Sequence, residues 1–133
     1  RWFPYTPAWA SLAALHEACR LVLDEGLEAV YARHARVAQH CRDRAREMGL
    51  SLHPIDEDGC SPTVTALKVP EPPGWEELDR RLRAHGMGVG GSLGPLAGRV
   101  FRIGHMGTQA DLELVDRGMD VIEQVLAAGR ADT

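Results

Sequence analysis

Arg102 is the residue whose type and position point most directly to chemistry. It interrupts the apolar run 100–103 and is followed at once by Gly104. Burying a guanidinium without a partner is costly, so an arginine in such a strand is expected to be paired. Its planar fork matches a carboxylate in two parallel hydrogen bonds. The residues alone leave two partners open, an internal Asp or Glu and the carboxylate of a substrate, and they slightly favour the internal one.

A glycine-rich stretch, residues 86–98, stands directly before this arginine. It lacks the G-K-[ST] sequence with which a P-loop holds phosphate and magnesium. It also lacks the strand, G-x-G-x-x-G, helix order of a dinucleotide site. The glycines therefore indicate a sharp turn or a close approach of the backbone to another group. A tight connection is favoured over a cradle for a ligand.

The remaining reactive residue types form no recognisable metal or nucleophile site. Neither H-x-x-x-H nor H-E-x-x-H occurs among the six histidines, so no metal site is expected. His105 is close enough in sequence to Arg102 to line the same site, although a histidine bonded to backbone is the commoner outcome. Lys68, the only lysine, lies in a predicted strand with no small-residue loop around it. A covalent role for Lys68 with a carbonyl compound is therefore not expected.

Composition limits the class of protein. The chain has 133 residues, the size of one domain, and its 44% apolar residues are enough for a core. A net charge of −4 argues against nucleic acid as a partner, and no apolar run reaches the length of a membrane span. Three widely spaced cysteines favour free thiols and a cytoplasmic location. The first residues have neither an initiator Met nor a signal peptide, so we expect the middle of a longer chain.

Two long helices are predicted in the first third of the chain. Thr6 is expected to cap the first helix, with Pro7 in its first turn. Gly26 breaks the apolar pattern, and a second helical stripe then runs to residue 48. The opposite face of this second helix is expected to be solvated, because acidic residues are interleaved with its arginines. These arginines are Arg33, Arg36, Arg42, Arg44 and Arg46.

The rest of the chain alternates short strands with helices. Strands are predicted over 50–53, 63–69 and 99–103, and the second of them is rich in β-branched residues. Helices are predicted over 75–85 and after a capping sequence that begins at Thr108. Long helices with few strands indicate an α+β fold. We expect a two-layer sandwich in which helices pack on one face of a small, mainly antiparallel sheet.

The sequence resembles that of a known enzyme family in one specific run. Residues 90–107 read GGSLGPLAGRVFRIGHMG. This run resembles the C-terminal signature of class V, fold-type I aminotransferases of the alanine–glyoxylate/serine–pyruvate type, which use pyridoxal 5'-phosphate (PLP). Residues 61–65, SPTVT, are similar to a strand of that family, and residues 6–12 to the segment that enters its small domain. The resemblance covers nearly the whole chain and identifies residues 1–133 as the C-terminal small domain of such an enzyme.

The resemblance assigns two residues to binding roles. Arg102 matches the arginine that binds the α-carboxylate of the amino acid or keto acid, which reverses the preference for an internal partner. Thr6 matches a threonine that reaches the cofactor phosphate of the neighbouring subunit in a homodimer. A tyrosine stands three residues before this threonine in some members, whereas this chain has Phe3, which has no hydroxyl.

The resemblance also implies what the chain lacks. The lysine, the aspartate and the ring-stacking aromatic residue that hold the cofactor belong to the large domain of the family. We therefore expect no catalytic residue in this chain and no transaminase activity when it is isolated.

Two alternatives stay open. Another class V enzyme, such as an aminoethylphosphonate or phosphoserine aminotransferase, shares the small domain. A cysteine desulfurase is disfavoured, because Cys60 stands far upstream of Arg102. The second alternative is a stand-alone module that binds small carboxylates through Arg102.

Overall fold

The computed structural model describes residues 5–131 of the chain. They belong to two compact units, residues 1–32 and residues 33–133, and each unit is described by itself. No helix within residues 5–131 combines the length and the apolar character that crossing a bilayer requires.

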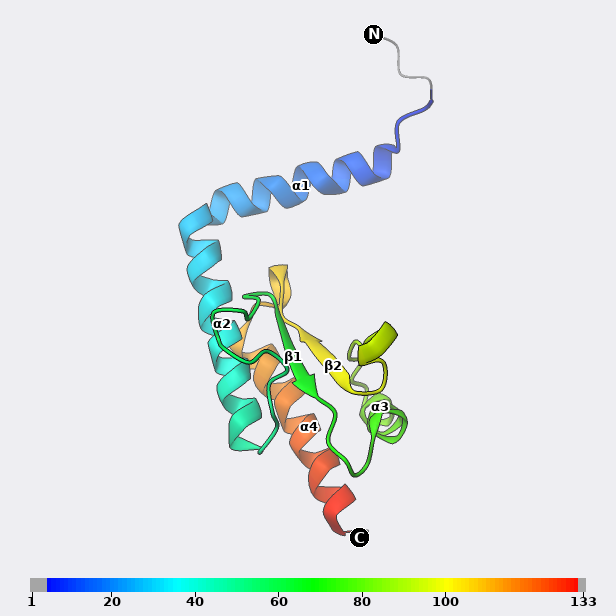
Figure 1. Ribbon diagram of the computed structural model, residues 1–133. Coiled ribbons are helices and arrows are strands. Elements are labelled where there is room, and N and C mark those ends of the chain that lie inside the picture. The colour runs from blue at the N-terminus through cyan, green and yellow to red at the C-terminus, as the bar shows by residue number, and fades with distance from the viewer. Residues whose placement is uncertain (1–4, 132–133) are drawn as a thin grey trace. The chain divides into compact units, whose positions relative to one another are not determined.

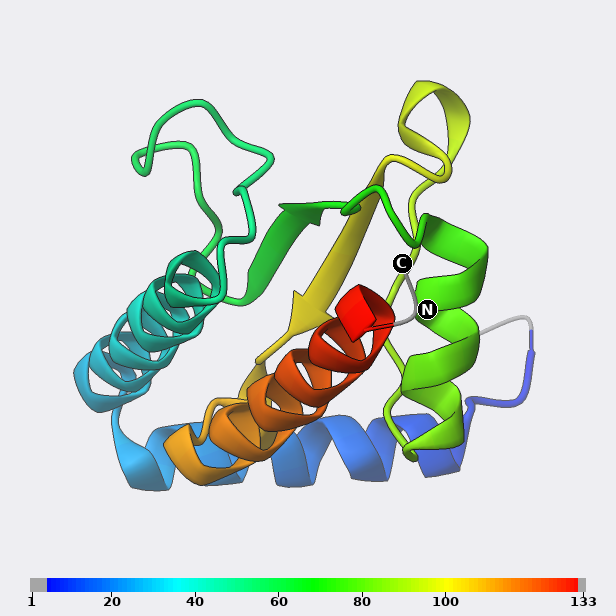
Figure 2. The same ribbon diagram turned by 90° about the horizontal axis from the view of Figure 1, so that it is seen from below.

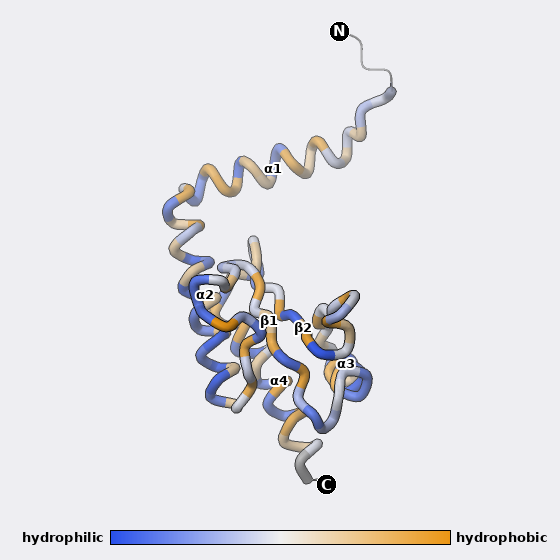
Figure 3. Tube along the Cα trace, in the orientation of Figure 1, coloured by the Kyte–Doolittle hydropathy of each residue, from blue (hydrophilic) through white to orange (hydrophobic). Residues whose placement is uncertain are grey.

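The first unit is dominated by the helix α1 (Trp9–Glu25), and α2 (Leu27–Glu47) begins at its end. The predicted break at Gly26 is confirmed, because this residue has a φ of 88° and its amide donates to the Val22 carbonyl. Hydrophobic residues recur along α1, yet none of its residues is buried (Figure 3). The predicted cap at Thr6 is wrong. The Trp9 amide donates to the Pro7 carbonyl in a turn, so that the helix starts after Ala8 without a side-chain cap.

A small antiparallel sheet is the centre of the second unit (Figure 1). It pairs β1 (Val64–Lys68) with β2 (Val100–Gly104), and Ala66 lies opposite Arg102. Single bridges extend it on both sides, from Leu52 to Leu67 and from Gly90 to Arg102. The strand predicted over 50–53 is thus reduced to one bridge, whereas the other two predicted strands are confirmed.

Helices cover one face of this sheet, as Figure 2 shows for α4 (Leu112–Ala131) and for residues 33–47 of α2. The helix α3 (Trp75–Ala84) packs beside α4, and two 3₁₀ turns, η1 (Gly94–Leu96) and η2 (Gly107–Gln109), flank β2. The core is formed by the apolar faces of these elements, including Val37, Cys41, Leu67, Leu78, Leu82, Phe101, Met119 and Ile122. The predicted α+β architecture, with helices on one face of a small antiparallel sheet, is confirmed.

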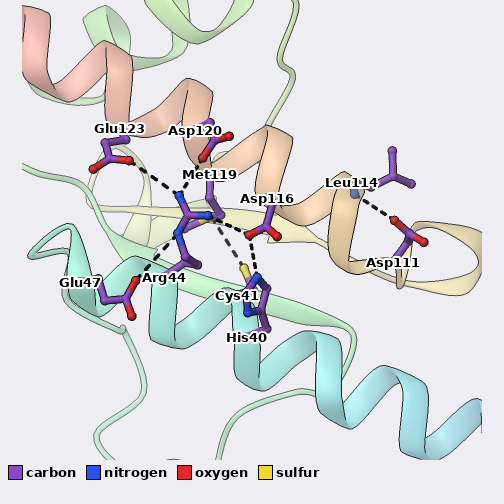
Figure 4. Close-up of polar contacts among 10 residues, drawn as sticks. All are labelled: His40, Cys41, Arg44, Glu47, Asp111, Leu114, Asp116, Met119, Asp120 and Glu123. Atoms are coloured by element: carbon purple, nitrogen blue, oxygen red, sulfur yellow. Dashed lines mark hydrogen bonds and ion pairs between the residues drawn. The ribbon is translucent and has the colours of Figure 1, made fainter.

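The start of α4 differs from the prediction. Asp111 caps the helix, because its Oδ1 accepts a hydrogen bond from the Leu114 amide at 2.9 Å (Figure 4). Thr108, the predicted cap, lies within η2 instead. An aspartate in this position satisfies a free amide and places negative charge at the positive end of the helix.

The arginine row of α2 is only partly solvated, and this prediction was wrong for one residue. Arg42 is buried, whereas Arg36 is exposed as expected. Arg33 donates to the carbonyl oxygens of Gly107 and Ala110, at 2.7 and 3.0 Å. Tertiary contacts that no helical pattern reveals therefore decide which of these arginines faces water.

Arg44 fastens α2 to α4 through a group of carboxylates (Figure 4). It donates to Asp116 and to Asp120, both at 2.8 Å. His40 lies 2.6 Å from the same Asp116 oxygen. The hydrogen bond to His40, and next the one to Arg44, lower the pKa of Asp116. An aspartate with a lowered pKa in the folded state stabilises the fold while it is ionised.

We predict that Asp116→Asn lowers the free energy of unfolding at pH 7 by up to about 1 kcal/mol, the upper range for pairs open to solvent. The difference from the wild type should shrink as the pH falls from about 5 towards 2, because the wild-type carboxyl then takes up a proton. Urea unfolding across this pH range measures it. Asp58→Asn, in the exposed loop 54–60, is the matched control and should change little. A pH-independent loss would contradict the role of the ionised carboxylate.

Candidate functional site

Arg102 lies on the face of β2 that points away from the helices. Side chains alternate along a strand, so the burial of Phe101 and Ile103 in the core brings Arg102 to the opposite face, where it is exposed. Its backbone is tied to Gly90 on the edge of the sheet: the Arg102 amide donates to the Gly90 carbonyl at 2.7 Å, and the Gly90 amide donates back at 3.0 Å. Both the amide and the carbonyl of Arg102 are therefore held by Gly90.

The guanidinium of Arg102 is held over the glycine-rich stretch. Its Nε and Nη2 donate to the Gly91 carbonyl at 3.1 and 2.7 Å. A Cβ atom on Gly90 would stand 3.3 Å from Nη2. The glycine at position 90 thus lets the side chain lie close to the backbone, which orients the fork.

The internal ion pair considered from the sequence is not formed with any carboxylate of residues 5–131. Within residues 5–131, no carboxylate is recorded as an ion-pair or hydrogen-bond partner of Arg102, and its partner is a neutral carbonyl. One nitrogen, Nη1, has no hydrogen-bond acceptor in this part of the chain. A guanidinium that is fixed by one edge and open at the other is suited to receive an anion.

The glycines of the stretch act by close approach and by turning, as predicted. A Cβ atom on Gly91 would stand 2.8 Å from Cζ2 of Trp75, closer than real Cβ contacts. The indole of Trp75 in turn stacks on Phe101, with ring centroids 6.4 Å apart. Gly91 is therefore required so that the edge segment can lie against the first turn of α3.

His105 does not join Arg102. It is fully buried on the helix side of the sheet, where its Nε2 lies 2.8 Å from the Thr65 hydroxyl. Burial, above all other causes, lowers the pKa of the His105 ring. The alternative of a structural histidine is therefore the one that the structure supports.

Thr6 is placed in the first unit and is exposed, in the segment before α1. Phe3 lies outside the described residues. Lys68 ends β1 with an exposed side chain, and Cys60 belongs to the loop before β1. Within residues 5–131, no three His, Cys, Asp or Glu side chains are close enough together to hold a metal ion.

A hollow of about 380 Å³ between the segment 86–89 and α4 was missed by the sequence reasoning, and Arg102 is not part of its wall. Residues 86–89, Ile103 and Gly104 line one side, and α4 lines the other through Leu114, Val115 and Gly118. The glycines of the segment 86–89 and Gly118 of α4 are the sequence signal that could have indicated this hollow. Without the pairing of Gly90 with Arg102, nothing in the sequence places these segments together.

Known proteins are similar to this chain in sequence and in fold. The chain is 37% identical to L-aspartate–glyoxylate aminotransferase of Paracoccus denitrificans over 94% of its own length and 32% of that protein. It is 36% identical to alanine–glyoxylate aminotransferase of Oryctolagus cuniculus over 95% of its length and 32% of that protein. By sequence the chain is homologous to these aminotransferases. No family model matches the chain.

The fold supports the same homology. The structure of pyridoxamine–pyruvate aminotransferase from Mesorhizobium loti matches 97% of the chain and 33% of that protein, with a TM-score of 0.91 and 32% identity. The resemblance drawn from residues 90–107 is therefore confirmed. The chain spans about a third of the length of the curated relatives it matches.

We predict that Gly91→Ala destabilises the chain by about 1–3 kcal/mol, the usual cost of forcing extra atoms into a packed site. The added Cβ meets the ring of Trp75, and the strand edge has to shift. Urea unfolding measures the loss. Gly88→Ala is the matched control, since a Cβ there meets nothing within 4 Å. Equal losses in the two variants would show that the contact with Trp75 does not require glycine.

Proposed function

We propose that residues 1–133 form the C-terminal small domain of a PLP-dependent aminotransferase. This enzyme moves an amino group between small amino acids, such as alanine or serine, and keto acids such as glyoxylate or pyruvate. The observation that carries the proposal is the guanidinium of Arg102, fixed by the Gly91 carbonyl and unpaired with any carboxylate of the described residues. The names of the homologous enzymes support the acceptor, because each contains glyoxylate or pyruvate.

Arg102 binds the α-carboxylate of the substrate in this proposal. Two parallel hydrogen bonds from a rigid guanidinium fix the direction of the carboxylate as well as its position. Holding a reactant in one orientation removes part of the entropic barrier to reaction. The exposed face of β2 is the side on which a second domain has access to this group, since the helices cover the other face.

The residues of this chain do not by themselves form a site for PLP. Covalent attachment of the cofactor requires a lysine, and Lys68 is exposed at the end of β1. We therefore assign no step of the reaction to the cofactor within this chain and expect the isolated chain to be inactive. When PLP is bound in the whole enzyme, it supplies the electron sink, and the lysine comes from the large domain.

Thr6 is proposed to contact the cofactor phosphate of the partner subunit in a homodimer. Its exposure leaves the hydroxyl accessible to a ligand. The cytoplasmic location stays a prediction from the cysteine pattern. Reading the coding sequence upstream of Arg1 tests the domain assignment: we expect a continuing frame with a lysine-bearing domain. A start site directly before Arg1 would favour the stand-alone carboxylate-binding module instead.

We predict that Arg102→Lys in the full-length enzyme raises KM for both the amino acid and the keto acid by about 10- to 100-fold. The lysine keeps the charge but loses the fork, and hydrogen bonds of charged groups contribute about 1.5–3 kcal/mol each. Steady-state kinetics with both substrates measures the change.

Arg99→Lys is the matched control, because Arg99 is an exposed arginine close to Arg102 in the same motif. Its KM values should equal those of the wild type. Unchanged KM values in Arg102→Lys would overturn the role of Arg102. Preference for aminoethylphosphonate over alanine, serine and glyoxylate would favour the other class V activity.

A further inference from the structure

Arg42 of α2 is a buried cation for which residues 5–131 provide no recorded anionic partner. Only 9% of the residue is exposed. Its single recorded partner is neutral: Nη2 donates to Oε1 of Gln39 at 2.8 Å. Its Nε is buried with no hydrogen-bond partner, and within residues 5–131 no carboxylate is recorded as an ion-pair partner. Arginines are almost never buried unless they are paired, so this environment lacks a negative group.

A hollow of about 160 Å³ adjoins this arginine. Arg42 forms part of its wall, and the segment that joins α2 to β1 forms much of the rest. The wall includes apolar groups of Leu52, Pro54 and Val64 and the hydroxyl-bearing Ser61. This hollow is separate from Arg102, which lies on the face of the sheet away from the helices and is absent from the wall.

The size and lining of the hollow define the class of ligand. A water molecule occupies roughly 30 Å³ of liquid, so this space corresponds to a molecule of about five non-hydrogen atoms. The guanidinium matches a carboxylate, and the apolar wall matches a short hydrocarbon chain. A phosphate dianion requires more donors than this mainly apolar wall provides.

The positive charge of Arg42 acts on the buried His105 of the same unit. It contributes, after burial, to the lowering of the pKa of His105. A buried positive charge that acts on its neighbours in this way is stabilised when an anion binds next to it.

From these observations we propose that the hollow beside Arg42 is a second carboxylate site, which binds a short-chain monocarboxylate. The carboxylate pairs with the Arg42 guanidinium, and the hydrocarbon end lies against Leu52, Pro54 and Val64. No bond is made or broken there. The site is independent of the role proposed for Arg102.

Titration of the ¹⁵N-labelled 133-residue chain with sodium propionate, at pH 7 and constant ionic strength, tests this site. We expect saturable amide shifts in residues 59–66, most of which line the hollow. Arg42→Met should weaken binding by about tenfold or more, because it keeps a similar volume and removes the charge and the fork. Arg36→Gln, an exposed arginine of the same helix, is the matched control and should titrate like the wild type.

Arg102→Gln separates the two carboxylate sites. It should abolish any shifts around residues 90–91 and leave those of residues 59–66 intact, so that failure of one proposal does not affect the other. If Arg42→Met does not fold, Arg42→Lys replaces it and should still weaken binding, since the fork is lost. Absence of saturable shifts in residues 59–66 of the wild type would overturn the proposal. Equal affinity in the Arg42 variant, or tighter binding of inorganic phosphate at the same residues, would also overturn it.

Discussion

The pairing of β1 with β2 is the constraint on which the rest of the second unit depends. Because side chains alternate along each strand, one register fixes both faces at once. Leu67, Phe101 and Ile103 enter the core, and Arg102 emerges on the other side. A slip of one residue would bury the guanidinium among the helices and expose the phenyl ring. The position of the proposed substrate-binding group thus follows from the packing of its apolar neighbours.

The position of Arg102 also depends on the close approach of the glycine-rich segment to the edge of β2. Gly90 and Arg102 exchange two backbone hydrogen bonds, and the Gly91 carbonyl accepts two hydrogen bonds from the Arg102 guanidinium. The same edge lies against Trp75, whose ring leaves no room for a side chain at position 91. One short segment therefore extends the sheet, orients the arginine and packs against α3. This explains why several glycines stand before the arginine, although they do not form a phosphate-binding loop.

Arg102 and Arg42 both lack a recorded carboxylate partner within residues 5–131, but their surroundings differ. Arg102 is exposed, so that water solvates its charge until a ligand arrives. Arg42 is buried beside an apolar hollow, where an unpaired charge is far more costly. Pairing with an anion is therefore expected to stabilise Arg42 more than Arg102. The orientation of the guanidinium, in contrast, is better defined at Arg102, where two hydrogen bonds to Gly91 hold it.

The sequence by itself determined the fold class, the strands of β1 and β2, most of the helices and the importance of Arg102. These depend on local periodicity, on turn residues and on one specific motif, all of which can be recognised in the sequence. Only the tertiary structure decided the surroundings of the polar side chains. It brought Gly91 to Trp75, separated His105 from Arg102, buried Arg42 in a helix face that looked solvated, and moved the start of α4 to Asp111. The physical reason is that periodicity records which face of an element is apolar, whereas the partner of a polar group depends on which distant segment packs against it.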